Sequence, residues 1–95
     1  MALFLTPSET KRVYPKNQTF TLEELQSYVE GYIERIPLDG GRAMYVNEEA
    51  RLTGLPKNTA ASVWYWELYE NADPDTYILG NAIIVGDLEE DDSPE

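Results

Sequence analysis

Residues 20–31 read FTLEELQSYVEG and carry the strongest local signal in the chain. Thr21 and Glu24 have the spacing of a capping box, in which each side chain accepts a hydrogen bond from the backbone N–H of the other residue. Phe20 before the cap and Leu25 at the fourth helical position form the matching hydrophobic staple. The stretch therefore predicts the start of a helix at residue 21.

The same helix has a clear apolar face and an expected end. Leu22, Leu25 and Val29 recur at helical spacing and share one face. Gly31 is the residue type that most often ends a helix in the left-handed conformation. We expect a helix over residues 21–30, with its left-handed end at Gly31.

Two β-hairpins are expected around this helix. Residues 2–6 and 11–14 are short β-rich runs separated by a four-residue loop. Residues 32–36 and 42–46 flank a turn that contains Asp39-Gly40-Gly41, and glycine tolerates the positive φ that such turns require.

The segments after the second hairpin are less regular. Asn47 is placed to cap a short helical turn within residues 47–58, and residues 76–79 and 82–85 are typical of short strands. Residues 59–70 fit a helix capped by Asn58, although their run of valine and aromatic residues also fits a strand. We leave that alternative open.

Together these elements predict one α+β domain over residues 1–86. Its antiparallel sheet is built from β-hairpins and packs against one or two helices. Residues 87–95 have too little apolar content to order, and we expect a disordered acidic tail there.

The residue types absent from the chain limit its chemistry. None of the 95 residues is cysteine or histidine, which excludes disulfides, thiolate metal sites and histidine-based acid–base or nucleophilic catalysis. We therefore expect a protein that is not an enzyme, with no catalytic residue, no metal site and no cofactor.

Charge is divided unevenly along the chain. The formal net charge is −11, from 18 acids and 7 bases, and six of those acids lie in the last nine residues, which carry no base. Residues 1–86 thus have 12 acids and 7 bases, a net charge of −5. Direct nucleic-acid binding is unfavourable for such a domain. Since no long apolar run or signal peptide is visible, we expect a cytoplasmic protein without a membrane span.

Five blocks of the sequence have a recognisable order and spacing: Phe20–Gln26, Val29–Glu34, Asn47–Glu49, Gly54–Ala60 and Ile78–Val85. With these blocks the chain resembles a family of small phage, plasmid and bacterial proteins, the domain of unknown function family 3846. The resemblance implies a compact α+β domain and a mobile-element setting, without an established activity. Glu30 departs from the pattern, which often has a second glycine before Gly31.

Acidic and aromatic side chains are the candidates for a docking surface. Asn47, Glu48 and Glu49 could bind a ligand, although a helix cap with acids in its first turn is the simpler explanation. If residues 59–70 are helical, Trp66 points away from Trp64 and is partly exposed, as an interface tryptophan would be; the alternative is core packing. The full candidate set is Tyr32, Glu34, Asn47, Glu48, Glu49, Asn58, Trp66 and Tyr69.

Two classes of function fit these observations. The first is a non-catalytic, mobile-element-associated protein that docks on a host protein, in its sharpest form by imitating phosphates on a nucleic-acid-binding defence factor. The second is an oligomer that sequesters a nucleotide signal, which requires convergent arginines from among Arg12, Arg35, Arg42 and Arg51. High acidity could also reflect solubility or a salty cytoplasm alone.

Overall fold

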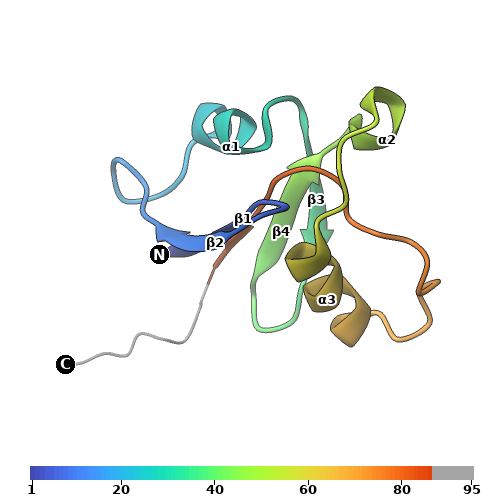
Figure 1. Cartoon of the computed structure of the whole chain (residues 1–95). Coiled ribbons are helices and arrows are strands. Elements are labelled where there is room, and N and C mark those ends of the chain that lie inside the picture. Colours follow the sequence, from blue (N-terminus) through green and yellow to red (C-terminus); the bar gives the residue numbers. More distant parts are fainter. Residues whose placement is uncertain (87–95) are drawn as a thin grey trace.

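A computed structural model describes residues 1–86, which form five strands and three helices (Figure 1). The acidic tail expected over residues 87–95 lies outside the described residues. No helix in residues 1–86 is long and apolar enough to cross a membrane. The elements are β1 (Ala2–Leu5), β2 (Thr10–Val13), α1 (Leu22–Val29), β3 (Ile33–Pro37), β4 (Ala43–Asn47), α2 (Ala50–Thr53), α3 (Thr59–Leu68) and β5 (Ala82–Val85).

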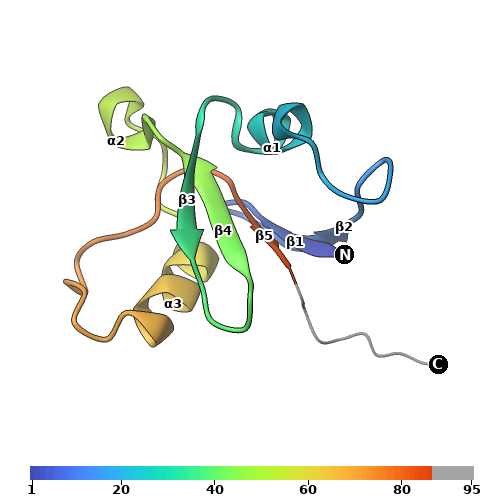
Figure 2. The same ribbon diagram turned by 180° about the vertical axis from the view of Figure 1, so that it is seen from behind.

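The five strands form one antiparallel sheet in the order β2-β1-β5-β4-β3. Both expected hairpins are present, β1 with β2 and β3 with β4, and the last strand, β5, lies between them. Figure 2 shows β3 as the outer strand beside β4. The predicted α+β class and the antiparallel sheet built from hairpins are confirmed.

Helices cover both faces of the sheet. Because side chains alternate along a strand, Ile83 of β5 faces α1 while Ile84 faces α3. Leu25 and Val29 of α1 pack on the first face, and Ala61 of α3 packs on the second. The domain therefore has three layers, with α1 and α3 on opposite sides of the sheet (Figure 1).

The start of α1 confirms the capping box. The Glu24 N–H donates to the Thr21 hydroxyl over 3.1 Å, and the Thr21 N–H donates to the Glu24 carboxylate over 2.8 Å. The other carboxylate oxygen of Glu24 accepts from the Lys16 N–H over 3.0 Å. These bonds stabilise the ionised form, so the backbone N–H of Thr21, and after it that of Lys16, lowers the pKa of Glu24.

The end of α1 corrects the prediction about Gly31. Glu30, with φ of 66°, takes the left-handed conformation, and its N–H bonds to the Gln26 carbonyl. Gly31 is needed for space, because a Cβ there would lie 2.7 Å from the Asn47 side-chain nitrogen. That amide donates to the Val29 carbonyl over 3.1 Å and so joins β4 to α1.

Two other expectations about α1 and α2 were also wrong. Leu22 is 58% exposed because the helix packs on the sheet one turn later, through Leu25 and Val29. Asn47 is the last residue of β4, and although its side chain accepts from the Glu49 N–H, α2 begins at Ala50 with no side-chain cap.

Residues 59–68 are helical, which resolves the open alternative. The Asn58 side chain caps α3 by accepting from the Ala61 N–H over 3.1 Å. The same side chain is fully buried and donates to the carbonyls of Leu5 and Gly80 over 2.9 and 2.8 Å. Asn58 thus joins α3 to two distant parts of the chain.

The strand expected over residues 76–79 does not form. Only an isolated bridge between Leu79 and Lys57 is present there. The backbone of Ile78 is bonded instead to the start of α3, because its N–H donates to the Ser62 hydroxyl and its carbonyl accepts from the Asn58 N–H. The segment therefore lies against α3 rather than in the sheet.

Candidate functional site

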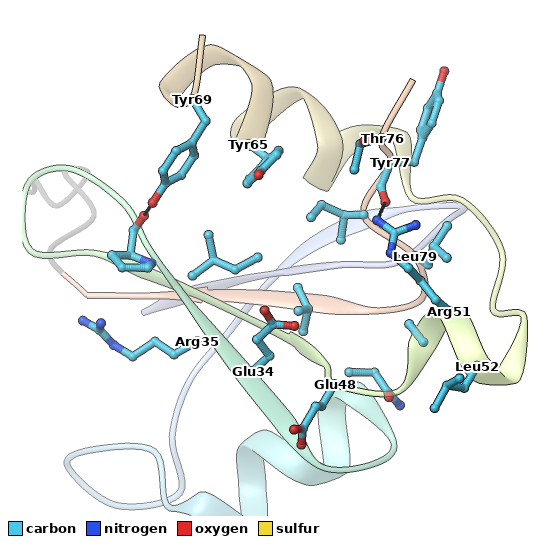
Figure 3. Close-up of a pocket in the computed structure, with 16 residues that line it drawn as sticks. Glu34, Arg35, Glu48, Arg51, Leu52, Tyr65, Tyr69, Thr76, Tyr77 and Leu79 are labelled. Carbon is cyan, nitrogen blue, oxygen red and sulfur yellow. Dashed lines mark hydrogen bonds between the residues drawn. The ribbon is translucent and has the colours of Figure 1, made fainter. Parts of the chain in front are cut away.

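A cleft of about 440 Å³ lies on the α3 side of β3 (Figure 3). Residues 34–37 of β3 form one side, and residues 76–79 form the other. α2 closes one end, and Tyr65 of α3 and Tyr69, which follows α3, close the other. Side chains from four parts of the chain therefore meet around one opening.

The α3 end of the cleft is held against β3 by tyrosines. The rings of Tyr65 and Tyr69 are stacked, with centroids 4.9 Å apart and an angle of 29° between their planes. The Tyr69 hydroxyl donates to the carbonyl of Pro37, the last residue of β3 (Figure 3). This bond fixes the position of α3 relative to the outer strand.

The opposite side of the cleft is held by contacts of Tyr77 and its neighbour. The Tyr77 ring lies edge-on to Trp66, with centroids 5.0 Å apart, and the Lys57 ammonium lies 4.4 Å from its centre. The Trp66 indole N–H donates to the Thr76 carbonyl over 2.9 Å. A long contact of 3.4 Å joins the Arg51 guanidinium to the Tyr77 carbonyl. The segment is thus fixed from α2, α3 and the loop before α3.

Two carboxylates border the cleft on the sheet side. Glu34 points to the α3 face of β3, the same face as Ile36, and Glu48 follows the end of β4. Both residues are exposed, and neither belongs to an ion pair among the described residues. Arg35 extends away from the tyrosines in Figure 3. The cleft therefore presents carboxylates and aromatic rings to the solvent.

The backbone of β3 adds a second set of polar groups. The Leu38 N–H donates to Arg42, and the Glu48 N–H donates to Tyr32, at the two ends of the β3–β4 ladder. Since bonded pairs alternate along an antiparallel ladder, Ile33 and Arg35 direct their N–H and C=O groups away from β4. β3 is the last strand of the sheet, so these groups lie on a free edge.

A comparison with protein families identifies the family of the chain. A profile described as a domain of unknown function, DUF3846, matches residues 1–95. The chain belongs to the DUF3846 family. No curated protein matches the chain, and no solved structure does.

The DUF3846 domain brings only part of the predicted candidate set to the cleft. Glu34, Asn47, Glu48 and Tyr69 line it. A second hollow of about 300 Å³ between the end of α1 and α2 includes Tyr32 and Glu49, and it shares Asn47 with the cleft. Since both hollows border β3 or its start, these residues lie along one side of the domain.

Two predicted residues make their side-chain contacts within the domain, Asn58 as a buried residue and Trp66 as a half-buried one. Asn58 is fully buried with all its side-chain bonds made, so it is not accessible to a partner. Trp66 packs against Tyr77 and bonds to Thr76, and it is not among the exposed large apolar residues. Its packing supports the core alternative rather than a free interface tryptophan.

The docking candidate set omitted Arg51, Tyr65 and Tyr77, which also line the cleft of this DUF3846 domain. No local pattern relates them, because each comes from a different segment. The adjacent charges of Glu34 and Arg35 were an available signal, since charged residues on both faces are typical of an edge strand.

Candidate metal ligands are sparse in the described part of the chain. Residues 1–86 contain no group of three or more Asp or Glu side chains placed to hold a metal ion. The groups that the cleft does offer are the carboxylates of Glu34 and Glu48, the guanidinium groups of Arg35 and Arg51, aromatic rings and edge backbone. These can bind a cationic or peptide-like surface.

Proposed function

We propose that this DUF3846 protein is a small non-catalytic binding protein that docks on another protein through the side formed by β3, its cleft and Tyr32. The observation that supports this proposal best is the free edge of β3 beside a cleft with tyrosines and exposed carboxylates. Tyr32, which directly precedes β3, is 66% exposed and adds an aromatic contact at the same side. Edge backbone and exposed tyrosine are common means of protein recognition.

The chemistry of the cleft favours binding over catalysis. The chain has no histidine or cysteine that could act as a base or nucleophile. The Tyr69 hydroxyl already donates to a backbone carbonyl, which leaves it a structural role. Glu34 and Glu48 are exposed carboxylates, which can pair with a cation of a partner.

In its narrower form the proposal concerns a mobile-element protein and a host target. The net charge of residues 1–86 is −5, from 12 acids and 7 bases, and this field would attract a basic nucleic-acid-binding surface. The end of α3 and the following loop add four exposed acids in nine residues with no base, namely Glu67, Glu70, Asp73 and Asp75. That charge supports inhibition of a defence factor by carboxylates in place of phosphates.

The positions of the arginines favour docking over nucleotide sequestration. Arg12 lies on β2 and Arg35 on β3, at opposite edges of the sheet. Arg42 is paired with Asp39 over 2.7 Å. Arg35 and Arg51 both line the cleft, but they lie on opposite sides of it in Figure 3. The four arginines therefore do not meet at one place within one chain, as a phosphate site would require.

Capture from a lysate of the host cell tests the proposal with a matched pair of variants. Tyr14 and Tyr32 are 65% and 66% exposed and lie next to opposite edge strands. We expect one protein to be captured by the wild type and by Tyr14→Ala, and to be lost with Tyr32→Ala. A chain ending at residue 86 separates the contribution of the last nine residues.

Two results would contradict docking at this side. One is capture of the same proteins by Tyr32→Ala and the wild type. The other is a nucleotide that co-purifies with the chain while no protein is captured, which would support the sequestering alternative.

A further inference from the structure

The free edge of β3 is short, and its outward hydrogen-bonding groups belong to only a few residues. Ile33 and Arg35 offer outward N–H and C=O groups, so an added strand can form up to about four backbone hydrogen bonds there. Pro37 has no N–H, and its carbonyl already accepts from Tyr69, which ends the available edge. An added segment therefore pairs over about five residues.

The side chains of β3 oppose pairing with a second copy of the chain. An antiparallel copy can pair the outward groups of Ile33 and Arg35 fully only in registers centred on Glu34 or on Arg35. A register centred on Ile33 would place Arg35 opposite Gly31, which lies before β3 and whose N–H already donates to the Gln26 carbonyl. The first register places Glu34 opposite Glu34, and the second places Arg35 opposite Arg35 and brings in Pro37, which lacks an N–H. Like charges directly opposite are destabilising, so the edge disfavours its own duplicate.

A different strand with complementary charges meets no such obstacle. A basic residue opposite Glu34 would lie on the cleft side, where the Glu48 carboxylate and the stacked Tyr65 and Tyr69 rings are also present. An acidic residue opposite Arg35 would lie on the α1 side of the sheet. Pairs across a non-hydrogen-bonded position, such as Glu34, have the closest side chains.

We propose that an extended segment of the partner protein adds to β3 as a sixth, antiparallel strand, with a basic residue opposite Glu34, an acidic residue opposite Arg35 and an apolar residue opposite Ile36. This inference rests on the proposed docking function and names the segment that the docking side accepts. The antiparallel direction follows the other strand pairs of the sheet. Addition of a strand to an exposed edge is an established mode of peptide recognition.

Two peptides of identical composition test the proposed register. The matched peptide Ac-Thr-Val-Glu-Lys-Val-Tyr-NH2 places valine, glutamate and lysine opposite Ile36, Arg35 and Glu34. The swapped peptide Ac-Thr-Val-Lys-Glu-Val-Tyr-NH2 exchanges the two charges. Titration into the 15N-labelled full chain at low salt gives the dissociation constants and shows which amides shift.

We expect the matched peptide to shift the amides of Ile33 and Arg35. The swapped peptide is expected to bind about tenfold more weakly, because two attractive cross-strand pairs become repulsive. The double variant Glu34→Lys with Arg35→Glu should reverse this preference. That reversal is a result that a loss of folding cannot imitate.

N-methylated versions of the matched peptide test the backbone bonds themselves. A methyl group on the nitrogen of the glutamate opposite Arg35 removes a bond to β3 and should abolish the shifts. A methyl group on the nitrogen of the lysine opposite Glu34 points away from β3 and should be tolerated.

The proposal is overturned by equal affinity for the two peptides, by shifts that do not include Ile33 and Arg35, or by no shift up to the solubility limit of the matched peptide. It is also overturned if the chain forms a dimer that the double variant dissociates. Any of these results, combined with capture of a protein that Tyr32→Ala abolishes, would leave docking standing without strand addition.

Discussion

Replacement of Asn58 with alanine should destabilise the domain strongly, although the side chain lies in a loop before a helix. Asn58 is fully buried, and its amide makes three bonds: it donates to the carbonyls of Leu5 and Gly80 and accepts from the Ala61 N–H. Alanine removes all three at once. A buried polar group left without its partner costs about 1–3 kcal/mol, and partial relaxation makes the sum smaller than three full penalties.

We expect the free energy of unfolding to fall by about 2–4 kcal/mol in Asn58→Ala. Small domains unfold with about 5–15 kcal/mol, so this is a large fraction of the total. At roughly 4–8 °C per kcal/mol for a chain of this size, the melting temperature should fall by about 10–30 °C. Urea unfolding followed by tryptophan fluorescence measures the change, and Asn17→Ala, at an exposed loop position, is the matched control.

Aspartate at the same position separates the cap from the two donated bonds. Aspartate caps helices about as well as asparagine, so Asn58→Asp would be nearly neutral if the cap to Ala61 were all that mattered. It also replaces the donor with an oxygen that faces the carbonyls of Leu5 and Gly80. We therefore expect Asn58→Asp to lose at least as much stability as Asn58→Ala. A loss below about 1 kcal/mol in either variant would refute the buried-network reasoning.

Three further predictions concern α1 and Trp66. Because the pKa of Glu24 is lowered in the folded state, the carboxylate contributes its full stability above the ordinary pKa of 4.5, and this stability is lost as pH falls through the folded pKa. Urea unfolding at a series of pH values measures this dependence. Glu24→Gln should remove it, and Glu23→Gln should keep it. Gly31→Ala should lower the melting temperature because its Cβ meets the β4 amide at 2.7 Å, whereas Glu30→Gly should stabilise by up to about 1 kcal/mol by relieving a left-handed residue. Trp66→Ala should cost about 2–3 kcal/mol through lost packing, and a melting temperature near that of the wild type would contradict its internal position.

Local signals in the sequence were sufficient to predict the elements whose stabilising contacts lie within a few residues of each other. The capping box begins α1 because both partners lie within four residues, and Gly40 and Gly41 adopt the positive φ that the β3–β4 turn requires. The order of the strands was not predicted. β5 follows α3 in the chain and is inserted between β1 and β4, which depends on contacts across most of the sequence.

Long-range contacts explain the expectations that were wrong. Gly31 has the residue type of a helix end, yet its role is set by an Asn47 side chain from another element. Asn58 was correctly predicted as a cap, but its bonds to residues 53 and 22 positions away have no local signature. Ile78 lies in an apolar run typical of a strand, and its backbone is bonded to α3 instead.

The sequence predicted the acidic and aromatic residues of the candidate site, but not how the fold brings them together. Glu34, Glu48 and Tyr69 stood out by type, and the fold brings them to one cleft. Their neighbours Arg51 and Tyr77 could not be related to them without knowing that residues 76–79 lie against α3. The free edge of β3 is likewise a property of strand order, which the sequence did not reveal.

The two edge strands of the sheet, β2 and β3, differ in the strands they can bind, and the net charge of the domain favours binding at β3. The charged residues of β2 are Lys11 and Arg12, both basic, so a complementary strand there would be acidic on both faces. A domain with net charge −5 over residues 1–86 repels such a partner as it approaches. β3 carries one acid and one base, so its complementary strand can belong to a partner that is basic overall.

Charge affects docking at β3 in two ways, at long range through the net charge and at short range through cross-strand pairs. The net charge acts at long range and is screened beyond about 8 Å at physiological salt, so added salt should slow association. The Glu34 and Arg35 pairs act across neighbouring strands, where side chains are about 5 Å apart and screening is weaker. Salt should therefore weaken the binding of a basic partner more than it reduces discrimination between the matched and swapped peptides.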